Sequence, residues 1–206
     1  MIVARSGLLI VISGPSGAGK GTVCKALLEK ISDLLLSISK TTRKPRAGEK
    51  DGVNYFFVTD SEFMEAVREG DFLEYACVYG HKYGTPRSYV EEKLAEGYDV
   101  ILEIDPQGAL QVMEVYPNAV FIFLIPPSWS ELCRRIEKRG TESKENMKKR
   151  LTAAVSELKQ AHKYGYIVVN DSVEEASKRI ISIIEAEKLR AFRNADLINA
   201  VIEEGG

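Results

Sequence analysis

The apolar run Leu8–Ile12 is followed one residue later by Gly14-Pro15-Ser16-Gly17-Ala18-Gly19-Lys20-Gly21-Thr22. A helical pattern begins at Lys20 and continues to about Ile31. A strand, a glycine-rich turn and a helix N-terminus in this order predict a phosphate cradle. The glycines let backbone N–H groups turn toward one point, and the helix end adds positive potential. We expect Lys20 to reach the outer phosphates of a nucleotide.

A metal site is expected beside this cradle. Gly21 stands where the general pattern has Ser or Thr, so Thr22 becomes the hydroxyl nearest a metal ion. Glu103 lies near the end of the expected strand Val100–Ile104, and Asp105 follows that strand directly. Two residues apart on a strand, their side chains point to the same side. We assign Mg²⁺ to Thr22 and Glu103, partly through water, against the alternative of a solvated strand end.

Short apolar runs recur along the chain, separated by amphipathic segments of helix length. Runs that are apolar throughout and rich in Val and Ile are typical of parallel strands covered on both faces, so we expect an α/β fold with helices on both sides of the sheet. Besides Leu8–Ile12, the expected strands are Leu34–Ile38, Val100–Ile104, Val120–Ile125 and Tyr166–Val169. The expected helices are Lys20–Ile31, Ala109–Tyr116, Trp129–Arg139, Glu145–Lys163 and Val173–Phe192.

The stretch from about Lys40 to Gly97 breaks this rhythm, and aromatic side chains are concentrated in it. Tyr55–Val58 and Phe72–Tyr75 are typical of hairpin strands, and Ser61–Arg68 of a short helix. We interpret the stretch as an inserted α+β lobe.

Composition excludes several classes of protein. The chain has 206 residues, enough for one domain with a small insert, and a formal net charge of −2, which argues against a bulk nucleic-acid binder. The 3 cysteines form no CxxC pair, which favours a reducing compartment over a disulfide framework or a zinc site. No apolar run near the start is long enough for a signal peptide or a membrane span. We therefore expect a cytoplasmic protein without nucleic-acid or membrane partners.

The net charge of the whole chain is close to zero, but two segments of the chain are basic. Residues 39–51 carry 5 basic and 2 acidic side chains, and residues 134–150 carry 8 basic and 3 acidic ones. Arg43 and Arg46 lie three apart on a loop, where two guanidinium groups can clamp one phosphate. In the second segment Gly140 interrupts two helical patterns and allows a hinge, so its basic side chains could close over polyphosphate. A solvated basic loop and a solvated helix face are the alternatives.

Taken in order, these motifs resemble the guanylate kinase family, one of the P-loop nucleoside monophosphate kinases, over roughly residues 7–188. The matching stretches are the cradle GPSGAGKGT, Ser39–Glu49 (SKTTRKPRAGE), Gly52–Phe57, Phe72–Tyr75, Tyr83–Thr85, Leu102–Asp105 with Gln107–Gly108, Pro126–Ser128, Arg139–Thr141 and Val169–Asp171. The resemblance implies that ATP and GMP are converted to ADP and GDP. It also implies a core of residues 1–39 and 98–206, a helical lid at about 135–160, and a GMP-binding lobe of residues 40–97.

The resemblance implies roles for single residues. ATP would be bound by Gly14, Pro15, Ser16, Gly17, Ala18, Gly19, Lys20, Gly21, Thr22 and Asn170. GMP would be bound through its phosphate by Arg43, Arg46, Tyr55 and Tyr83, and through its base by Ser39, Glu74, Thr85 and Asp105. The cationic groups that serve the transferred phosphoryl group would be Lys20, Arg43, Arg135, Arg139 and Arg150.

The chemistry of guanine supports the base contacts. Guanine offers N–H donors at N1 and at its exocyclic amine, which carboxylates accept, whereas N1 of adenine is an acceptor. Tyr55 and Tyr83 have a second interpretation, as aromatic packing inside the lobe.

Two other functions remain open from the sequence. Guanylate-kinase-like domains also serve as non-catalytic binding modules, although here the cradle is intact. A kinase for another nucleoside monophosphate is the second alternative, and dGMP is a further expected acceptor. A monomer and a homo-oligomer are equally compatible with the sequence, and the apolar residues beyond Ala186 could dock on the core or on a second chain.

Overall fold

The computed structural model describes residues 6–46, 48–78, 80–138 and 144–205. The core is a five-stranded sheet of order β2-β7-β1-β8-β9, in which every printed pairing is parallel. Its strands are β1 (Leu9–Ser13), β2 (Leu34–Leu36), β7 (Asp99–Glu103), β8 (Val120–Ile125) and β9 (Tyr166–Val169). The five strands expected from the sequence are thus confirmed, with small differences at their ends.

Both faces of this sheet are covered because its strands are apolar on both sides. Ile10 and Ile12 of β1 pack into one buried cluster with α1 (Lys20–Leu28) and α7 (Val173–Lys188). Leu9 and Val11 pack into the opposite cluster, with α3 (Arg87–Ala95) and α4 (Pro106–Val115). Helices on both faces of a parallel sheet confirm the predicted fold class.

The inserted segment carries a second, four-stranded sheet of order β4-β3-β6-β5. Its elements are β3 (Lys40–Thr41), β4 (Phe56–Phe57), α2 (Asp60–Arg68), β5 (Phe72–Val78) and β6 (His81–Pro86). The hairpin prediction is correct for β5, which pairs antiparallel with β6. It is wrong for Tyr55–Val58, because β4 pairs parallel with β3 and so arrives by a long connection rather than a tight turn.

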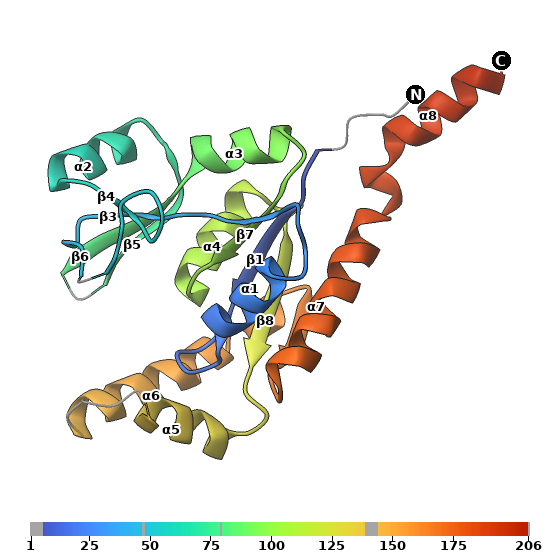
Figure 1. Cartoon of the computed structure of the whole chain (residues 1–206). Coiled ribbons are helices and arrows are strands. Elements are labelled where there is room, and N and C mark those ends of the chain that lie inside the picture. The colour runs from blue at the N-terminus through green and yellow to red at the C-terminus, as the bar shows by residue number, and fades with distance from the viewer. Residues whose placement is uncertain (1–5, 47, 79, 139–143, 206) are drawn as a thin grey trace.

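Two helices pack together beside the core, as Figure 1 shows below the sheet in gold and orange. They are α5 (Trp129–Lys138) and α6 (Lys144–Leu158), joined through buried Leu132, Ile136 and Ala154. A 3₁₀ turn, η1 (Ala161–Lys163), follows α6 where the sequence pattern suggested one continuous helix.

The chain ends in η2 (Ala191–Arg193) and α8 (Ala195–Gly205), which continue the direction of α7 and extend away from the core (Figure 1). None of the described residues of α8 is buried. Docking on the core, one of the two positions considered for the tail, is therefore wrong for α8, whereas Glu187 and Arg193 before it are bonded to the core. In the parts of the chain that the structure describes, no helix is both long and apolar enough to span a membrane.

Candidate functional site

The glycine-rich turn between β1 and α1 has a backbone that only glycine adopts easily. Gly14, Gly17 and Gly19 have φ angles of 146°, 88° and 92°. A Cβ on Gly14 would lie 2.2 Å from the carbonyl oxygen of Leu124, so β8 passes too close for any side chain. The turn is therefore fixed by both conformation and space.

Backbone N–H groups at the start of α1 donate no hydrogen bond to a side chain of the N-cap residue. Gly19 is the N-cap residue of α1 and has no side chain to bond these groups. The ammonium of Lys20 donates to the carbonyl oxygen of Gly14 at 2.6 Å, so it lies over the turn. A cavity of about 170 Å³ lies here, lined by the turn together with Glu103, Asp105 and Glu157.

The neighbouring carboxylate explains why glycine follows the lysine. A Cβ on Gly21 would lie 3.3 Å from both carboxylate oxygens of Glu103, closer than such contacts usually are. Thr22 lines an adjoining cavity of about 420 Å³. A carboxylate and a hydroxyl are hard oxygen donors, which is the chemistry that Mg²⁺ prefers. Among the described residues no group of three or more His, Cys, Asp or Glu side chains is arranged to hold a metal ion.

Asn170 and Arg135 hold the turn from the side of β9 and α5. The buried Asn170 amide donates to the carbonyl oxygen of Ala18 at 2.7 Å. The Arg135 guanidinium donates to Ala18 O at 3.3 Å and to Asn170 O at 3.0 Å, and Glu131 accepts a bond of 2.7 Å from its Nε. Both side chains also line the cavity that contains Thr22, so they lie at the place the sequence assigned to ATP.

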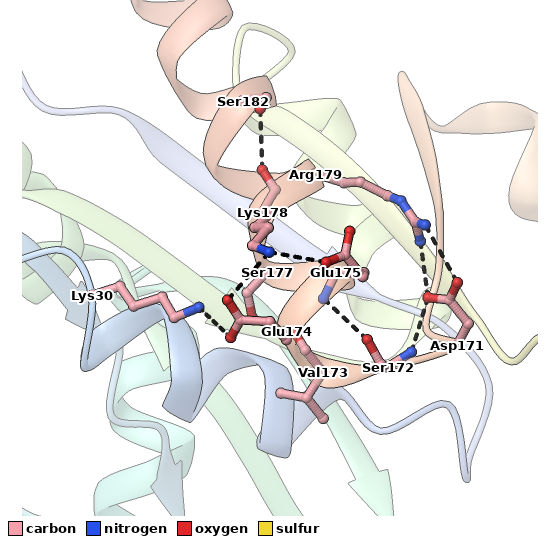
Figure 2. A network of polar contacts seen from close by, with 10 residues as sticks. All are labelled: Lys30, Asp171, Ser172, Val173, Glu174, Glu175, Ser177, Lys178, Arg179 and Ser182. Atoms are coloured by element: carbon pink, nitrogen blue, oxygen red, sulfur yellow. Dashed lines mark hydrogen bonds and ion pairs between the residues drawn. The ribbon is translucent and has the colours of Figure 1, made fainter.

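The turn from β9 into α7 forms another wall of this cavity, and its polar contacts are drawn in Figure 2. Ser172 caps α7 by accepting the Glu175 N–H at 3.2 Å, and Asp171 accepts the Ser172 N–H at 2.9 Å. Arg179 pairs with Asp171 at 3.0 Å and keeps the pKa of that carboxyl below its ordinary value. These contacts fix the wall of the cavity before any ligand binds.

A further cavity, of about 330 Å³, lies where the lobe meets the core sheet. It contains seven of the eight side chains that the sequence assigned to GMP: Ser39, Arg43, Arg46, Tyr55, Glu74, Tyr83 and Asp105. The eighth, Thr85, lies behind Glu74 and is buried. Residues far apart in the chain are thus brought together by the insertion of the lobe.

Glu74 is the buried carboxyl of this cavity. The Thr85 hydroxyl donates to its Oε1 at 2.6 Å. The pKa of Glu74 is raised to about 7, mainly by burial and in part by the nearby charge of Asp105, while the Thr85 bond opposes the change. A Cβ on Gly108 would lie 2.7 Å from Glu74 Oε2, so a side chain at this position of α4 would force the carboxyl to shift.

Asp105 has a structural role as well. It is the N-cap residue of α4 and accepts the Gly108 N–H at 2.8 Å. The end of β7 and the start of α4 therefore hold Asp105 beside Glu74.

Arg43 is held by a partner that sequence reasoning did not assign. Its guanidinium makes two bonds of 2.9 Å to the carboxylate of Glu49, which also accepts the Arg46 N–H at 2.7 Å. The same guanidinium lies over the Tyr55 ring, 5.3 Å from its centroid. Glu49 belongs to the basic stretch quoted above, and its spacing of six residues from Arg43 on a loop gave no signal of the pairing.

The basic residues expected in the lid differ in their positions, and Arg135 lines a cavity described above. Arg150 lies on α6 and is not among the residues that line these three cavities in the part of the chain that the structure describes. Arg139 lies outside the described residues. Instead, α6 contributes an acidic residue, because the carboxylate of Glu157 accepts the Ser16 N–H at 3.2 Å. No sequence pattern connects residues 141 positions apart.

A parallel sheet with this cradle after its first strand defines the class of P-loop nucleotide-binding proteins. The family model of guanylate kinase matches residues 6–187. A guanylate kinase of Caldanaerobacter subterraneus subsp. tengcongensis is 58% identical over 204 residues, 99% of each chain. One of Clostridium perfringens is 59% identical over 187 residues, 91% of this chain and 87% of its own.

Solved structures agree with the sequence relatives. The crystal structure of guanylate kinase from Anaplasma phagocytophilum superposes with a TM-score of 0.75 at 36% identity, over 94% of this chain and 92% of its own. The chain belongs to the guanylate kinase family, and its activity is that of a nucleoside monophosphate kinase.

Proposed function

We propose that ATP binds in the glycine-rich cradle, that GMP binds between the lobe and the core sheet, and that the γ-phosphoryl group passes between them to give ADP and GDP. The observation that carries this assignment is the wall that the two cavities share. Glu103 and Asp105 line both the cavity of the cradle and the cavity that contains Glu74. Two nucleotides in these cavities would bring their phosphates together, and alignment of the reactants is the main contribution that such enzymes make.

Base selection is assigned to Glu74 and Asp105. Their carboxylates would accept the N1–H and the exocyclic amine of guanine, and adenine would present an acceptor to the same oxygens. The buried Thr85 supports this role because its hydroxyl orients the carboxylate of Glu74. The assigned residues address the base and the phosphate of the acceptor, so dGMP is proposed as a second acceptor.

Phosphate binding and charge compensation are assigned to the basic and phenolic side chains. Arg43, Arg46, Tyr55 and Tyr83 would bind the phosphate of GMP, while Lys20 would bind the outer phosphates of ATP. Arg135, Arg139 and Arg150 would add positive charge from the lid. The attacking oxygen of GMP is already anionic near neutral pH, so the reaction needs charge compensation and alignment rather than a general base.

Mg²⁺ is the proposed cofactor. Thr22 and Glu103 would hold it, partly through water, and the phosphates of ATP would complete its coordination, as is usual for this ion. When bound, it would neutralise charge on the transferred group. The cytoplasm is the proposed location, and it is supported by Cys24, Cys77 and Cys133, all of which are free thiols.

Separate titrations test the two assigned sites. Lys20→Ala should lower turnover at least about a hundredfold and weaken ATP binding, since one fixed cation in such a site contributes about 3 kcal/mol to the transition state. The affinity of the Lys20→Ala variant for GMP should stay within about twofold of the affinity of the unmodified protein. Lys25→Ala removes an exposed lysine from the same helix and is the matched control. Equal activity of the Lys20 and Lys25 variants would refute the assignment of ATP to the cradle.

A further inference from the structure

The phosphate cradle already contains an anionic side chain. Glu157 lies next to the last residue of α6, and its carboxylate accepts the Ser16 N–H at 3.2 Å. It lines the same cavity as Lys20 and the glycines of the turn. This is the space in which the outer phosphates of ATP are proposed to bind.

The surroundings of Glu157 show what holds a carboxylate there. Burial is the main reason why the pKa of Glu157 is raised above its ordinary value; the Ser16 N–H and the positive charge of Lys20 oppose this change, and the negative charge of Asp105 adds to it. The groups that favour the ionised carboxylate are therefore the backbone donor and the positive charge of the cradle. These are the groups that would otherwise bind a phosphate oxygen.

Packing keeps the carboxylate close to the cradle. Ala154 is buried against Leu132 and Ile136 of α5, and Leu158 packs against both that cluster and the core cluster. The end of α6 is thus fixed on the core, and Glu157 is its polar contact with the turn.

We propose that Glu157 is a resident anion of the cradle: it accepts the Ser16 N–H in the cavity that Lys20 also lines, where an outer phosphate would bind, and it is displaced when ATP arrives. This rests on the proposed binding of ATP in the cradle. Two negatively charged acceptors cannot share one N–H donor and one ammonium without a cost, so Glu157 lowers the affinity for ATP. Because it projects from α6, its displacement links occupation of the cradle to the helix that carries Arg150.

Glu157→Gln tests the proposal because it removes the charge but keeps an oxygen that can accept the Ser16 N–H. We expect the Kd for ATP, measured by calorimetric titration, to fall at least about fivefold, since bonds to ionised acceptors are roughly twice as strong as neutral ones. The Kd for GMP should not change. Glu137→Gln removes an exposed carboxylate from α5 and should leave the Kd for ATP within about twofold.

Several outcomes would overturn the proposal. An unchanged or higher Kd for ATP in Glu157→Gln would show that the carboxylate braces the turn or contributes to ATP binding. An equal decrease of the Kd for ATP in Glu137→Gln would show that only the net charge of the region matters. If Glu157→Gln does not fold by thermal melting, Glu157→Ala gives the same test and the same expected decrease. The Lys20→Ala titration separates the two hypotheses, because ATP binding that is insensitive to Lys20 refutes the site itself.

Discussion

Glu74 combines burial with a position where guanine is proposed to bind. Its pKa is about 7, so near neutral pH it is partly protonated. The N–H donors of guanine favour the ionised form, which means that GMP binding lowers this pKa and releases a proton below pH 7. The Kd for GMP should therefore rise about tenfold as the pH falls from 8 to 6, which titration calorimetry in two buffers can measure.

The variant Glu74→Gln separates this effect from the ionisation of the GMP phosphate, which titrates near pH 6. In the variant, GMP should bind more weakly at pH 8, and only the smaller dependence from the phosphate should remain. ATP affinity should not change. A pH dependence equal to that of the unmodified protein would show that another group carries the proton.

Single residues differ in how far the sequence predicted them. The cradle could be predicted because its chemistry depends on adjacent residues, Gly14 to Thr22, and the cavity residues of the lobe because their motifs match a family. Glu49 and Glu157 could not. Glu49 acts through Arg43, which is the residue that the pattern makes visible, and Glu157 reaches Ser16 only after α6 packs on the core.

The N-terminus of α4 lies against both carboxylates that are proposed to select the base, Glu74 and Asp105. A methyl group on Gly108 would lie 2.7 Å from the carboxylate of Glu74, and the Gly108 N–H is the group that Asp105 caps. Gly108→Ala should therefore displace the carboxylate of Glu74 and raise the Kd for GMP at least about tenfold. Overpacking of this kind costs about 1–3 kcal/mol, so the melting temperature should fall by several degrees.

Gly165→Ala, directly before β9, is the control for the substitution itself, because its new Cβ would lie at an ordinary 3.7 Å from Phe121 O. ATP affinity should be retained in both variants. Undiminished GMP affinity in Gly108→Ala would contradict the role given to the start of α4.

Elements with a strong hydrophobic pattern can be predicted from the sequence, whereas short strands that depend on their pairing partner cannot. The strands of the core sheet are apolar on both faces, and such runs can be identified without knowing their neighbours. By contrast, β3 is only two residues long and β4 is another two, so their parallel pairing depends on the lobe as a whole. The sequence interpretation of the lobe region does not include the helix α3, although its residues Val90 and Leu94 pack on the core sheet.

At the scale of the whole molecule, no described residue of α8 lines the three cavities described above. The chain is anchored before it, where buried Glu187 binds the Tyr166 hydroxyl at 2.5 Å and Arg190 at 3.2 Å. Because no described residue of α8 is buried, a chain ending at Asn194 should keep its turnover. Its melting temperature should stay within about 2 °C, as expected for a change of about 0.5 kcal/mol. Loss of turnover on truncation would mean that α8 has a function in catalysis, directly or through another molecule.

Two cavities share an acidic wall. The central inference from this arrangement is that the protein transfers phosphoryl groups from ATP to a guanine nucleotide. The most direct test is an assay coupled to ADP release that compares GMP, dGMP, AMP, UMP and CMP as acceptors with ATP and Mg²⁺. We predict turnover of GMP and dGMP, with kcat/KM for GMP at least about a thousandfold above that for AMP, because the carboxylates of Glu74 and Asp105 would face an unpaired acceptor of adenine. Preference for AMP, or no turnover with any acceptor, would contradict the account.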